Sequence, residues 1–403
     1  MRAFRLMTAA LLTVTTSAAQ AQPVIVADSG DNGWMLAAAL LMLITMLPGL
    51  ALFYGRSRSG DTGLALFAST AITTLVFAVI GYSLAFSDGT SLIGGAANAM
   101  LADLADVQPD MTISGTVHAL FELAAAIFAV AILLGSISGR TRLGWLLAFA
   151  ALWMLFVYVP VAHWVWGGGW IAVLGALDYS GGIVVQTTAG VSALVIAVLV
   201  GRDHSADVVE DPRMMLGGAG ILLVGWLALI GGSSFSATGD AAEAVINAQL
   251  AASAAVLTGL LIERLRTGSI SAQGAALSAI AGLAAVSAGA TFIAPAGAII
   301  IGIIGATGAA AAAWLVRVLN LGSASTAFIA HGGGAIPGAI VFPLFVLPGF
   351  GGPGFDDGLT VGGQVATQGI AVLAVALWAA IATAIAALMI SMVLPMVDRD
   401  AQT

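Results

Sequence analysis

The chain has 403 residues, of which 60% are hydrophobic and only 8% are charged, with 12 basic and 20 acidic side chains. A soluble domain has roughly a quarter of its residues charged, so most of this surface must face lipid. The sequence contains no cysteine, which excludes disulfides, thiol catalysis and cysteine-based metal sites. Nucleotide-binding loops and zinc motifs are absent too, so we expect no cofactor, no nucleic-acid partner and no energy-coupled pump.

Residues 1–21 have the pattern of a cleavable signal peptide. Arg2 and Arg5 form a basic start, residues 6–14 are apolar, and Ala19 and Ala21 fit a small-x-small cleavage site. The alternative is an uncleaved first anchor, although the apolar stretch is short for a membrane span. Cleavage would leave the mature N-terminus outside the cell.

Residues 22–397 are predicted to form one membrane domain, followed by a short tail at 398–403. Apolar runs long enough to cross the ~30 Å of hydrocarbon in a bilayer recur along this domain. They lie at 33–54, 63–86, 115–136, 143–163, 181–200, 214–235, 245–262, 270–292, 297–316, 324–346 and 366–395. The predicted fold class is therefore an all-α polytopic membrane protein with about eleven transmembrane helices.

Because the chain has no lysine, the arginines are its only strongly basic side chains, and their positions test the number of spans independently. They fall on alternate connections or ends of the predicted spans: Arg56, Arg58, Arg140, Arg142, Arg202, Arg213, Arg264, Arg266, Arg317 and Arg399. The intervening connections carry acidic residues and no basic ones. The positive-inside rule then predicts an N-terminus outside, a C-terminus in the cytoplasm and an odd number of spans.

Many of the 51 glycines lie inside the predicted spans, where small residues let transmembrane helices approach closely. Close packing is the first interpretation of each one, but residues 332–334 are expected to leave open space beside the ring of His331. A loose repeat aligns 184–190 with 329–335, five spans apart, which gives the two halves opposite topology. This alignment pairs Gln186 with His331.

Polar side chains at membrane depth are costly, and they indicate either a pathway or a partner helix. For His331 the alternatives are a pathway residue or a ring satisfied by a neighbouring helix, and for Gln186 a pore residue or an amide joining two helices. Glu122 is the only carboxylate predicted well inside a span. It is either protonated and hydrogen-bonded between helices, or a negative charge presented to a cation in a wet vestibule.

Two residues are predicted near the outer ends of spans. Asp178 comes just before the fifth span, where a carboxylate can accept hydrogen bonds from the free backbone N–H groups at a helix N-terminus. This structural role is favoured over direct contact with a substrate. Trp166 is either part of an aromatic belt at the membrane interface or one wall of a cation–π site.

Several segments resemble the ammonium transporter family (Amt/Mep/Rh). Residues 48–55 (PGLALFYG) resemble its first-span signature, and 81–86 (GYSLAF) the end of its second span. Residues 158–169 (YVPVAHWVWGGG), followed by 175–178 (GALD), resemble its fourth-to-fifth-span segment, and 330–332 (AHG) match near the end of the chain. The order and spacing of these matches cover nearly the whole mature chain.

The resemblance implies a homotrimer with one pore per subunit, built from two inverted five-helix repeats plus one helix. It implies an outer cation site, which falls on Phe121, Trp166 and Ser233, with Asp178 as a structural aspartate. It also implies a phenylalanine gate above an apolar pore lined by two histidines. Here Ala125 and Leu229 replace the gate rings, Gln186 replaces the first histidine, and Glu122 stands where an uncharged residue is usual.

The function that the resemblance implies is inward transport of ammonium or ammonia across a bacterial inner membrane, recruited at the outer site and passed between Gln186 and His331. The alternatives are a non-conducting ammonium sensor and a channel for another small polar solute. An enzyme is not expected, because His331 and Glu122 lack a nucleophile or a metal-ligand set. The short tail argues against binding of a signalling protein at the cytoplasmic face.

Overall fold

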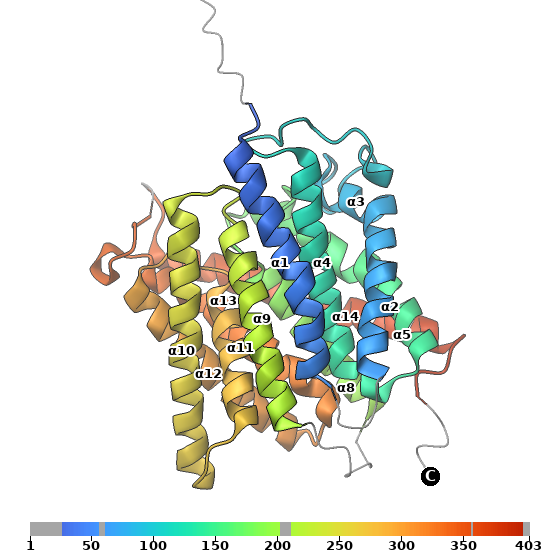
Figure 1. Ribbon diagram of the computed structural model, residues 1–403, viewed down its shortest axis with the longest axis vertical. Helices are drawn as coiled ribbons and strands as arrows, with labels where there is room; N and C mark the ends of the chain where they lie inside the picture. Colours follow the sequence, from blue (N-terminus) through green and yellow to red (C-terminus); the bar gives the residue numbers. More distant parts are fainter. Residues whose placement is uncertain (1–25, 56–60, 202–210, 356–357, 398–403) are drawn as a thin grey trace, which may run out of the picture.

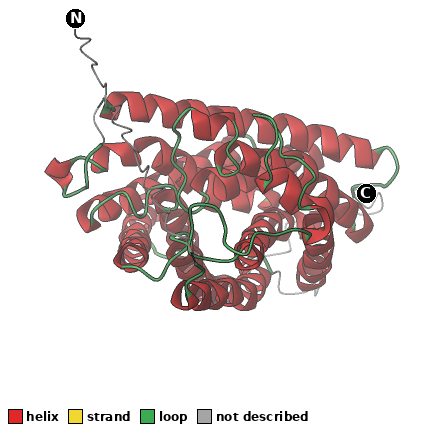
Figure 2. Cartoon of the chain, turned by 90° about the horizontal axis from the view of Figure 1, so that it is seen from above, coloured by secondary structure: helices red, strands yellow, loops and turns green. Residues whose placement is uncertain are grey.

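Helices make up every regular element in the part of the chain that the computed structural model describes, which is residues 26–55, 61–201, 211–355 and 358–397 (Figure 2). The predicted leader at 1–21 and tail at 398–403 lie outside these ranges. The longer helices are α1 (Ser29–Phe53), α2 (Asp61–Val76), α4 (Gly115–Ile137), α5 (Leu143–Trp153), α8 (Thr188–Val200), α9 (Pro212–Gly232), α10 (Gly239–Thr267), α11 (Ala272–Val286), α12 (Pro295–Val318) and α14 (Val361–Ser391). Shorter ones extend or join them: α3 (Tyr82–Phe86), α6 (Val159–Val165), α7 (Trp170–Val173) and α13 (Gly333–Val341).

Ten helical segments of the described residues are long and apolar enough to cross a membrane, and α11, with 15 residues, is a shorter eleventh. The prediction of an all-helical protein with about eleven apolar helices is thus confirmed. The range predicted at 270–292 is too long, since α11 ends at Val286 and irregular turns follow. These turns expose carbonyl groups that other segments use: Ser180 N donates to Ser287 O, and the Asn247 side chain donates to Ala290 O and Ile293 O.

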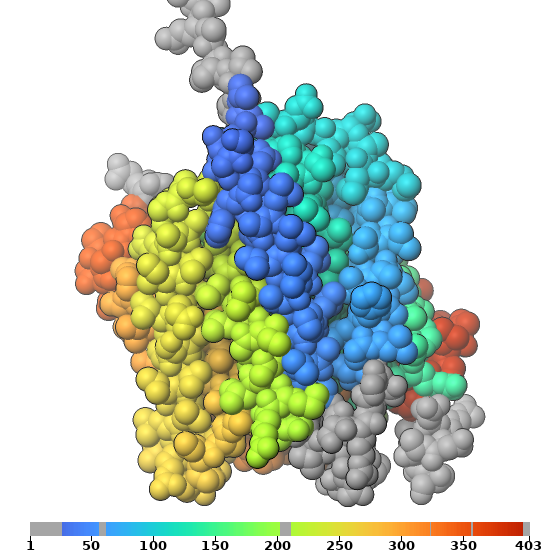
Figure 3. Space-filling view, in the orientation of Figure 1, coloured from blue at the N-terminus to red at the C-terminus, as the bar shows by residue number. Residues whose placement is uncertain are grey.

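Helix α4 is buried along most of its length, among α1, α2 and α8. Helix α1 packs against α9 and α4, while α10, α11 and α12 pack against one another. In Figure 1 these helices run roughly parallel to the long axis, and α14 crosses behind them. Figure 3 shows that α1, α9 and α10 share one broad outer face of the molecule.

The chain changes direction at successive spanning segments, so that the described basic residues gather at one end, where Asp211 and Glu263 also lie. The described arginines border helix ends at what we call the arginine end: Arg140, Arg142, Arg213, Arg264, Arg266 and Arg317. Asp31 and Asp240, in the first turns of α1 and α10, and Asp178, just before η5, lie at the opposite end. This acidic end is at the top of Figure 1.

Two single turns of π-helix, η5 (Gly182–Thr187) and η7 (Phe328–Gly332), carry Gln186 and His331. A π-turn bonds each N–H to the carbonyl five residues earlier and is frequently found at functional sites. The N–H of Gln186 donates to Gly181 O at 2.8 Å. Both residues of the predicted repeat pair therefore lie in the same unusual backbone geometry, on segments that run in opposite directions.

Glycines allow the two π-turn segments to cross at backbone contact. A Cβ at Gly190, on α8, would lie 2.5 Å from the backbone nitrogen of Gly332. The expectation of open space beside His331 is wrong. A Cβ at Gly333 would be 2.8 Å from Ala312 Cβ, and one at Gly334 would be 2.3 Å from Ala281 O. Neighbouring helices fill the space beside these glycines, because close packing drives the association of helices in lipid.

Candidate functional site

Seven of the nine predicted site residues line a single cavity of about 270 Å³ near the acidic end. These seven are Phe121, Glu122, Ala125, Trp166, Asp178, Leu229 and Ser233. The same cavity is lined by Phe86, Met111, His118, Val165, Tyr179 and Phe235, none of which was predicted as a site residue. Gln186 and His331 do not line it and form a separate buried pair.

Helix α4 supplies one wall of the cavity through Phe121, Glu122 and Ala125, which lie within about one turn of the helix. Phe121 and Ala125 are buried, at 2% and 1% exposure. The Phe121 ring packs against Gly232, where an added Cβ would lie 2.4 Å from the ring. Its edge meets the Phe235 ring at a centroid distance of 5.6 Å. The Phe121 ring therefore lines the same cavity as Ala125, the position at which the resemblance implies a phenylalanine.

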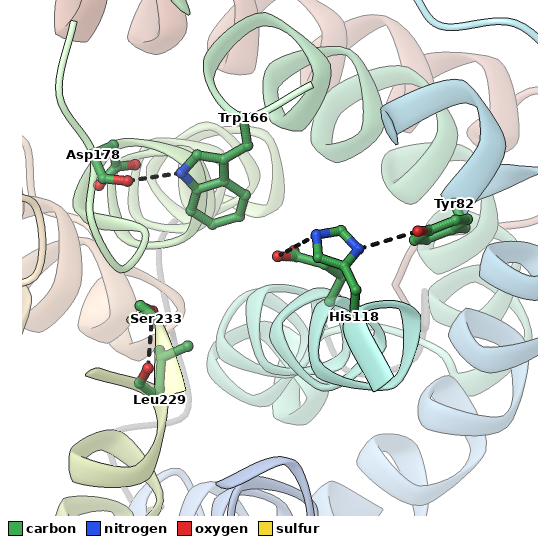
Figure 4. Close-up of polar contacts among 7 residues, drawn as sticks. Tyr82, His118, Trp166, Asp178, Leu229 and Ser233 are labelled. Carbon is green, nitrogen blue, oxygen red and sulfur yellow. Dashed lines mark hydrogen bonds and ion pairs between the residues drawn. The ribbon is translucent and has the colours of Figure 1, made fainter. Parts of the chain in front are cut away.

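Glu122 lies in this wall with a histidine one turn before it. His118 Nε2 is 3.9 Å from Glu122 Oε1, and His118 Nδ1 is 3.1 Å from the hydroxyl oxygen of Tyr82 (Figure 4). His118 and Glu122 are 4% and 5% exposed. Glu122 Oε2 has no hydrogen-bond partner among the described residues. Neither oxygen therefore makes the hydrogen bond between helices that one of the two interpretations of Glu122 requires.

Two further rings enclose His118. The Phe86 ring lies edge-on at 5.2 Å, and the Phe235 ring lies at 5.4 Å with a tilt of 31°. Phe235 follows α9 with a φ of 52°, a left-handed backbone conformation that is uncommon for residues other than glycine. That turn directs its ring toward α4. The cavity thus combines the carboxyl groups of Glu122 and Asp178 with several aromatic faces.

Asp178 caps the turn that carries Gln186. Its Oδ2 accepts hydrogen bonds from the backbone N–H groups of Ile183 at 2.9 Å and Val184 at 2.8 Å. Burial raises the pKa of this carboxyl to about 7, although the backbone hydrogen bonds act in the opposite direction. Asp178 also holds Trp166, whose Nε1 donates to the Asp178 carbonyl at 2.8 Å. Both residues therefore have a structural bond as well as a place in the cavity wall.

Helix α9 supplies the facing wall through Ser233 and Leu229, which lie one turn apart. The Ser233 hydroxyl donates to Leu229 O at 2.9 Å, so the lone pairs of its oxygen remain available as acceptors. Leu229 is 1% exposed and meets Ala125 in the same cavity lining. Figure 4 shows Trp166 and Ser233 facing the Tyr82–His118 side of the site.

Gln186 and His331 form a fully buried pair. Gln186 Oε1 and His331 Nδ1 are 2.7 Å apart, and both side chains have 0% exposure. Because an amide oxygen only accepts hydrogen bonds, this contact requires the proton of the neutral imidazole to be on Nδ1. Gln186 Nε2 and His331 Nε2 have no partner among the described residues. One donor and one acceptor are therefore left for a guest.

The region between the cavity and this pair is walled by rings. Trp226 stacks on His331 at a centroid distance of 5.6 Å and 11° between planes, and the edge of Phe128 meets Trp226 at 5.2 Å. Trp226 is fixed by a hydrogen bond from Nε1 to Ser287 Oγ at 3.0 Å. Phe128 is three residues after Ala125 and Trp226 three residues before Leu229, so the same faces of α4 and α9 continue from the cavity to His331.

Among the residues that sequence reasoning missed, six make the aromatic and histidine contacts described above: Tyr82, Phe86, His118, Phe128, Trp226 and Phe235. Helical spacing from Phe121 and Leu229 would have found His118, Phe128 and Trp226. Tyr82, Phe86 and Phe235 come from other segments, and no local pattern in the sequence indicates their direction. Among the described residues, no group of three His, Asp or Glu side chains is placed to hold a metal ion.

Residues 33–403 match the model of the Ammonium Transporter Family. The chain belongs to the ammonium transporter family. It is 37% identical over 382 residues to the ammonium transporter of Bacillus subtilis, covering 91% of this chain and 93% of that one. It is 36% identical over 377 residues to that of Aquifex aeolicus, covering 91% and 88%. The family consists of transporters rather than enzymes.

Solved structures agree with this assignment. Candida albicans Mep2 superposes with a TM-score of 0.83 at 28% identity, covering 91% of this chain and 85% of the Mep2 chain. A protein described as a sensor Amt protein has the same fold, with a TM-score of 0.84 at 22% identity over 92% and 95% of the two chains. The ammonium transporter-like fold and the multi-pass membrane character predicted from the sequence are thereby confirmed.

Proposed function

We propose that this chain carries ammonium-derived nitrogen across the membrane through a path inside its own helices. The path begins in the cavity at the acidic end, passes between Ala125 and Leu229, and continues to Gln186 and His331. The observation that carries the proposal is the continuity of two helix faces. The residues of α4 and α9 that line the cavity are followed, one turn on, by the rings that pack against His331.

The cavity has the chemistry to collect ammonium. The cation has four N–H donors and is attracted to the faces of aromatic rings. Trp166 and Phe121 offer such faces, the Ser233 oxygen offers lone pairs, and Glu122 offers a carboxylate oxygen with no other partner. These groups support the outer-site assignment made from the sequence, and they favour the interpretation of Glu122 as a charge presented to a cation.

The part of the proposed path at Ala125 and Leu229 is aliphatic. Ala125 and Leu229 provide no hydrogen bonds and no ring face, so a cation at this point loses its water without compensation. A neutral ammonia molecule pays a much smaller cost at the same position. This selectivity favours passage of the neutral guest even though two rings of the family gate are missing.

The Gln186–His331 pair suits the neutral guest as well. Ammonia has one lone pair and three N–H groups, so it can accept from Gln186 Nε2 and donate to His331 Nε2. Ammonium has no lone pair and would leave the amide donor unsatisfied. An amide also does not readily take up a proton, whereas two hydrogen-bonded imidazoles can pass one between them. We therefore infer electroneutral passage of ammonia at this pair.

The orientation follows from the charges. By the positive-inside rule, the arginine end faces the cytoplasm and the acidic end faces outward, in a bacterial inner membrane. Flow from the acidic cavity to the arginine end is then inward. The signal peptide at 1–21 remains a prediction that fits this orientation.

We also infer that three chains assemble, each with its own path. Gln249 and Ser253 are exposed near the middle of α10. Among the described residues, the amide contacts only its own helix, with Nε2 3.4 Å from Ser253 Oγ. Polar side chains at that depth commonly join helices rather than face lipid. The number three comes from the family resemblance.

Purified protein in liposomes tests the proposal directly. Methylammonium uptake and ammonium-induced current would be measured beside a His331→Ala variant and empty liposomes. We expect saturable uptake that the variant loses. Absence of uptake by a folded protein would overturn transport and favour the non-conducting sensor, and uptake of a different small solute would favour the altered channel.

A further inference from the structure

Glu122 is in an unusual position for a carboxylate. It is 5% exposed, on the most buried helix of the molecule, and its Oε2 has no partner among the described residues. Holding an ionised carboxylate away from water is costly unless a positive charge or several hydrogen bonds compensate. No arginine lines the cavity. The carboxyl is then stabilised either as the protonated acid or by a small cation that enters the cavity.

The groups around Glu122 determine which of its oxygens is available. Those that titrate and face it are His118 from α4, Tyr82 from α3, Tyr158 from η4 (Met154–Tyr158), and Asp178 and Tyr179 from the segment before η5. When the Tyr82 hydroxyl donates to His118 Nδ1, the proton of the neutral ring is on Nε2, which faces Glu122 Oε1 at 3.9 Å. Oε2 is then available to contact a molecule in the cavity.

We propose that Glu122, oriented by His118 and Tyr82, removes the proton from ammonium in the cavity, so that only ammonia continues past Leu229. This proposal rests on the proposed function and adds the residue at which the charge is lost. In the step, one N–H bond of ammonium breaks and its electron pair stays on nitrogen, while a new O–H bond forms on Glu122 Oε2. The protonated carboxyl then returns its proton to water at the acidic end.

Two physical reasons favour the step at this position. In a cavity screened from water, a carboxylic acid beside ammonia costs less to hold than a carboxylate beside ammonium, since charged groups lose more hydration. Further along the path, Gln186 cannot receive a proton from His331. A proton that enters with nitrogen would therefore have no exit through the pair. The net event is movement of ammonia, with one proton left on the side of entry.

His118 and Tyr82 act as positioning residues. The 3.9 Å separation of His118 Nε2 and Glu122 Oε1 is too long for a hydrogen bond, and a small side-chain rotation or one bridging water closes it. The ring then holds Oε1 while Oε2 exchanges its proton. Removing this contact should move the pH at which Glu122 works without abolishing the step.

The test compares Glu122→Gln with the native protein in liposomes, and Glu243→Gln, an exposed position on α10, is the matched control. Glutamine keeps the size and polarity of the side chain but accepts no proton. We expect methylammonium uptake to fall by about a hundredfold, the lower end of the range for loss of a general base, while calorimetry still detects methylammonium binding to the purified variant. Glu243→Gln should transport normally.

The pH profile gives the second readout. Glu122 must be ionised to accept a proton, so native uptake should fall as the outer pH falls through its ionisation, and His118→Phe and Tyr82→Phe should shift that midpoint. Native-like uptake by Glu122→Gln would overturn the proposal while leaving transport intact. Loss of both binding and uptake in that variant would also overturn it, because Glu122 would then only hold the cation. No uptake by the native protein would instead overturn the proposed function.

Discussion

A single amide decides what the deepest part of the path can carry. Gln186 and His331 are joined at 2.7 Å, as two histidines would be, but only one member of the pair can exchange a proton at that contact. The contact fixes the tautomer of His331 and leaves its Nε2 as an acceptor. The pair is thus suited to a neutral donor–acceptor guest.

Replacing the amide by a second imidazole should change the charge that accompanies each nitrogen. In Gln186→His the two rings can pass a proton, so we expect ammonium-induced current to appear and to exceed the native current by about tenfold or more. The measurement is current and methylammonium uptake from the same liposome preparation. If native protein already carries one charge per methylammonium, the electroneutral mechanism is wrong.

Asp178 should matter chiefly for stability. Asp178→Ala leaves the N–H groups of Ile183 and Val184 without their acceptor, which should cost about 1–3 kcal/mol and lower the melting temperature in detergent. Asp178→Asn retains an acceptor oxygen and should lose much less. Equal melting temperatures for the two variants would show that the cap contributes little to the fold.

The site residues differ in how far the sequence can indicate them. Glu122 stands out because it is an acidic residue in an apolar run, and His331 and Gln186 because they are polar at membrane depth. Their partners do not stand out in this way. Tyr82 reaches His118 from a different helix, and Phe235 reaches it only because its backbone is left-handed. Such contacts depend on how the helices pack and on a single turn, neither of which a hydropathy pattern contains.

At the scale of helices, the two π-turns and the glycine crossing between them set the geometry of the pair. Each π-turn adds a residue to one turn and so rotates the side chains that follow it. The apolar runs predicted these segments as plain spans, because hydropathy does not distinguish a π-turn from an α-turn. For the same reason the end of α11 was placed too late. Apolar residues continue beyond Val286, but the carbonyl groups there bond to other segments.

The glycine crossing can be tested with one methyl group. In Gly190→Ala the new Cβ would lie 2.5 Å from the Gly332 nitrogen and 2.7 Å from its Cα. Backbone atoms cannot move aside as a flexible side chain can, so we expect a loss of about 1–3 kcal/mol and reduced methylammonium uptake. Gly217→Ala on α9, where nothing lies within 4 Å, should melt and transport like the native protein. If Gly190→Ala instead melts and transports like the native protein, the two segments separate easily.

On the scale of the whole molecule, the described outer surface is largely what a lipid environment requires. Exposed side chains on the spanning helices are mostly apolar, such as Ile44 on α1, Leu257 on α10 and Leu373 on α14. Gln249 and Ser253 interrupt this shell on one face of α10. Since polar groups at this depth are costly in lipid, this face is the one we expect another subunit to cover.

A bulky residue on that face should separate the subunits. Gln249→Trp would remove the amide and place a large ring where a second chain packs, whereas Leu373→Trp, at a position 60% exposed on α14, should be accommodated by lipid. Native mass spectrometry of the detergent-solubilised protein should give about three times the mass of one chain for the native protein and for Leu373→Trp. Gln249→Trp should give mainly single chains. A native protein of one chain mass would exclude the trimer. A Gln249→Trp variant that stays fully trimeric would place the interface on another face.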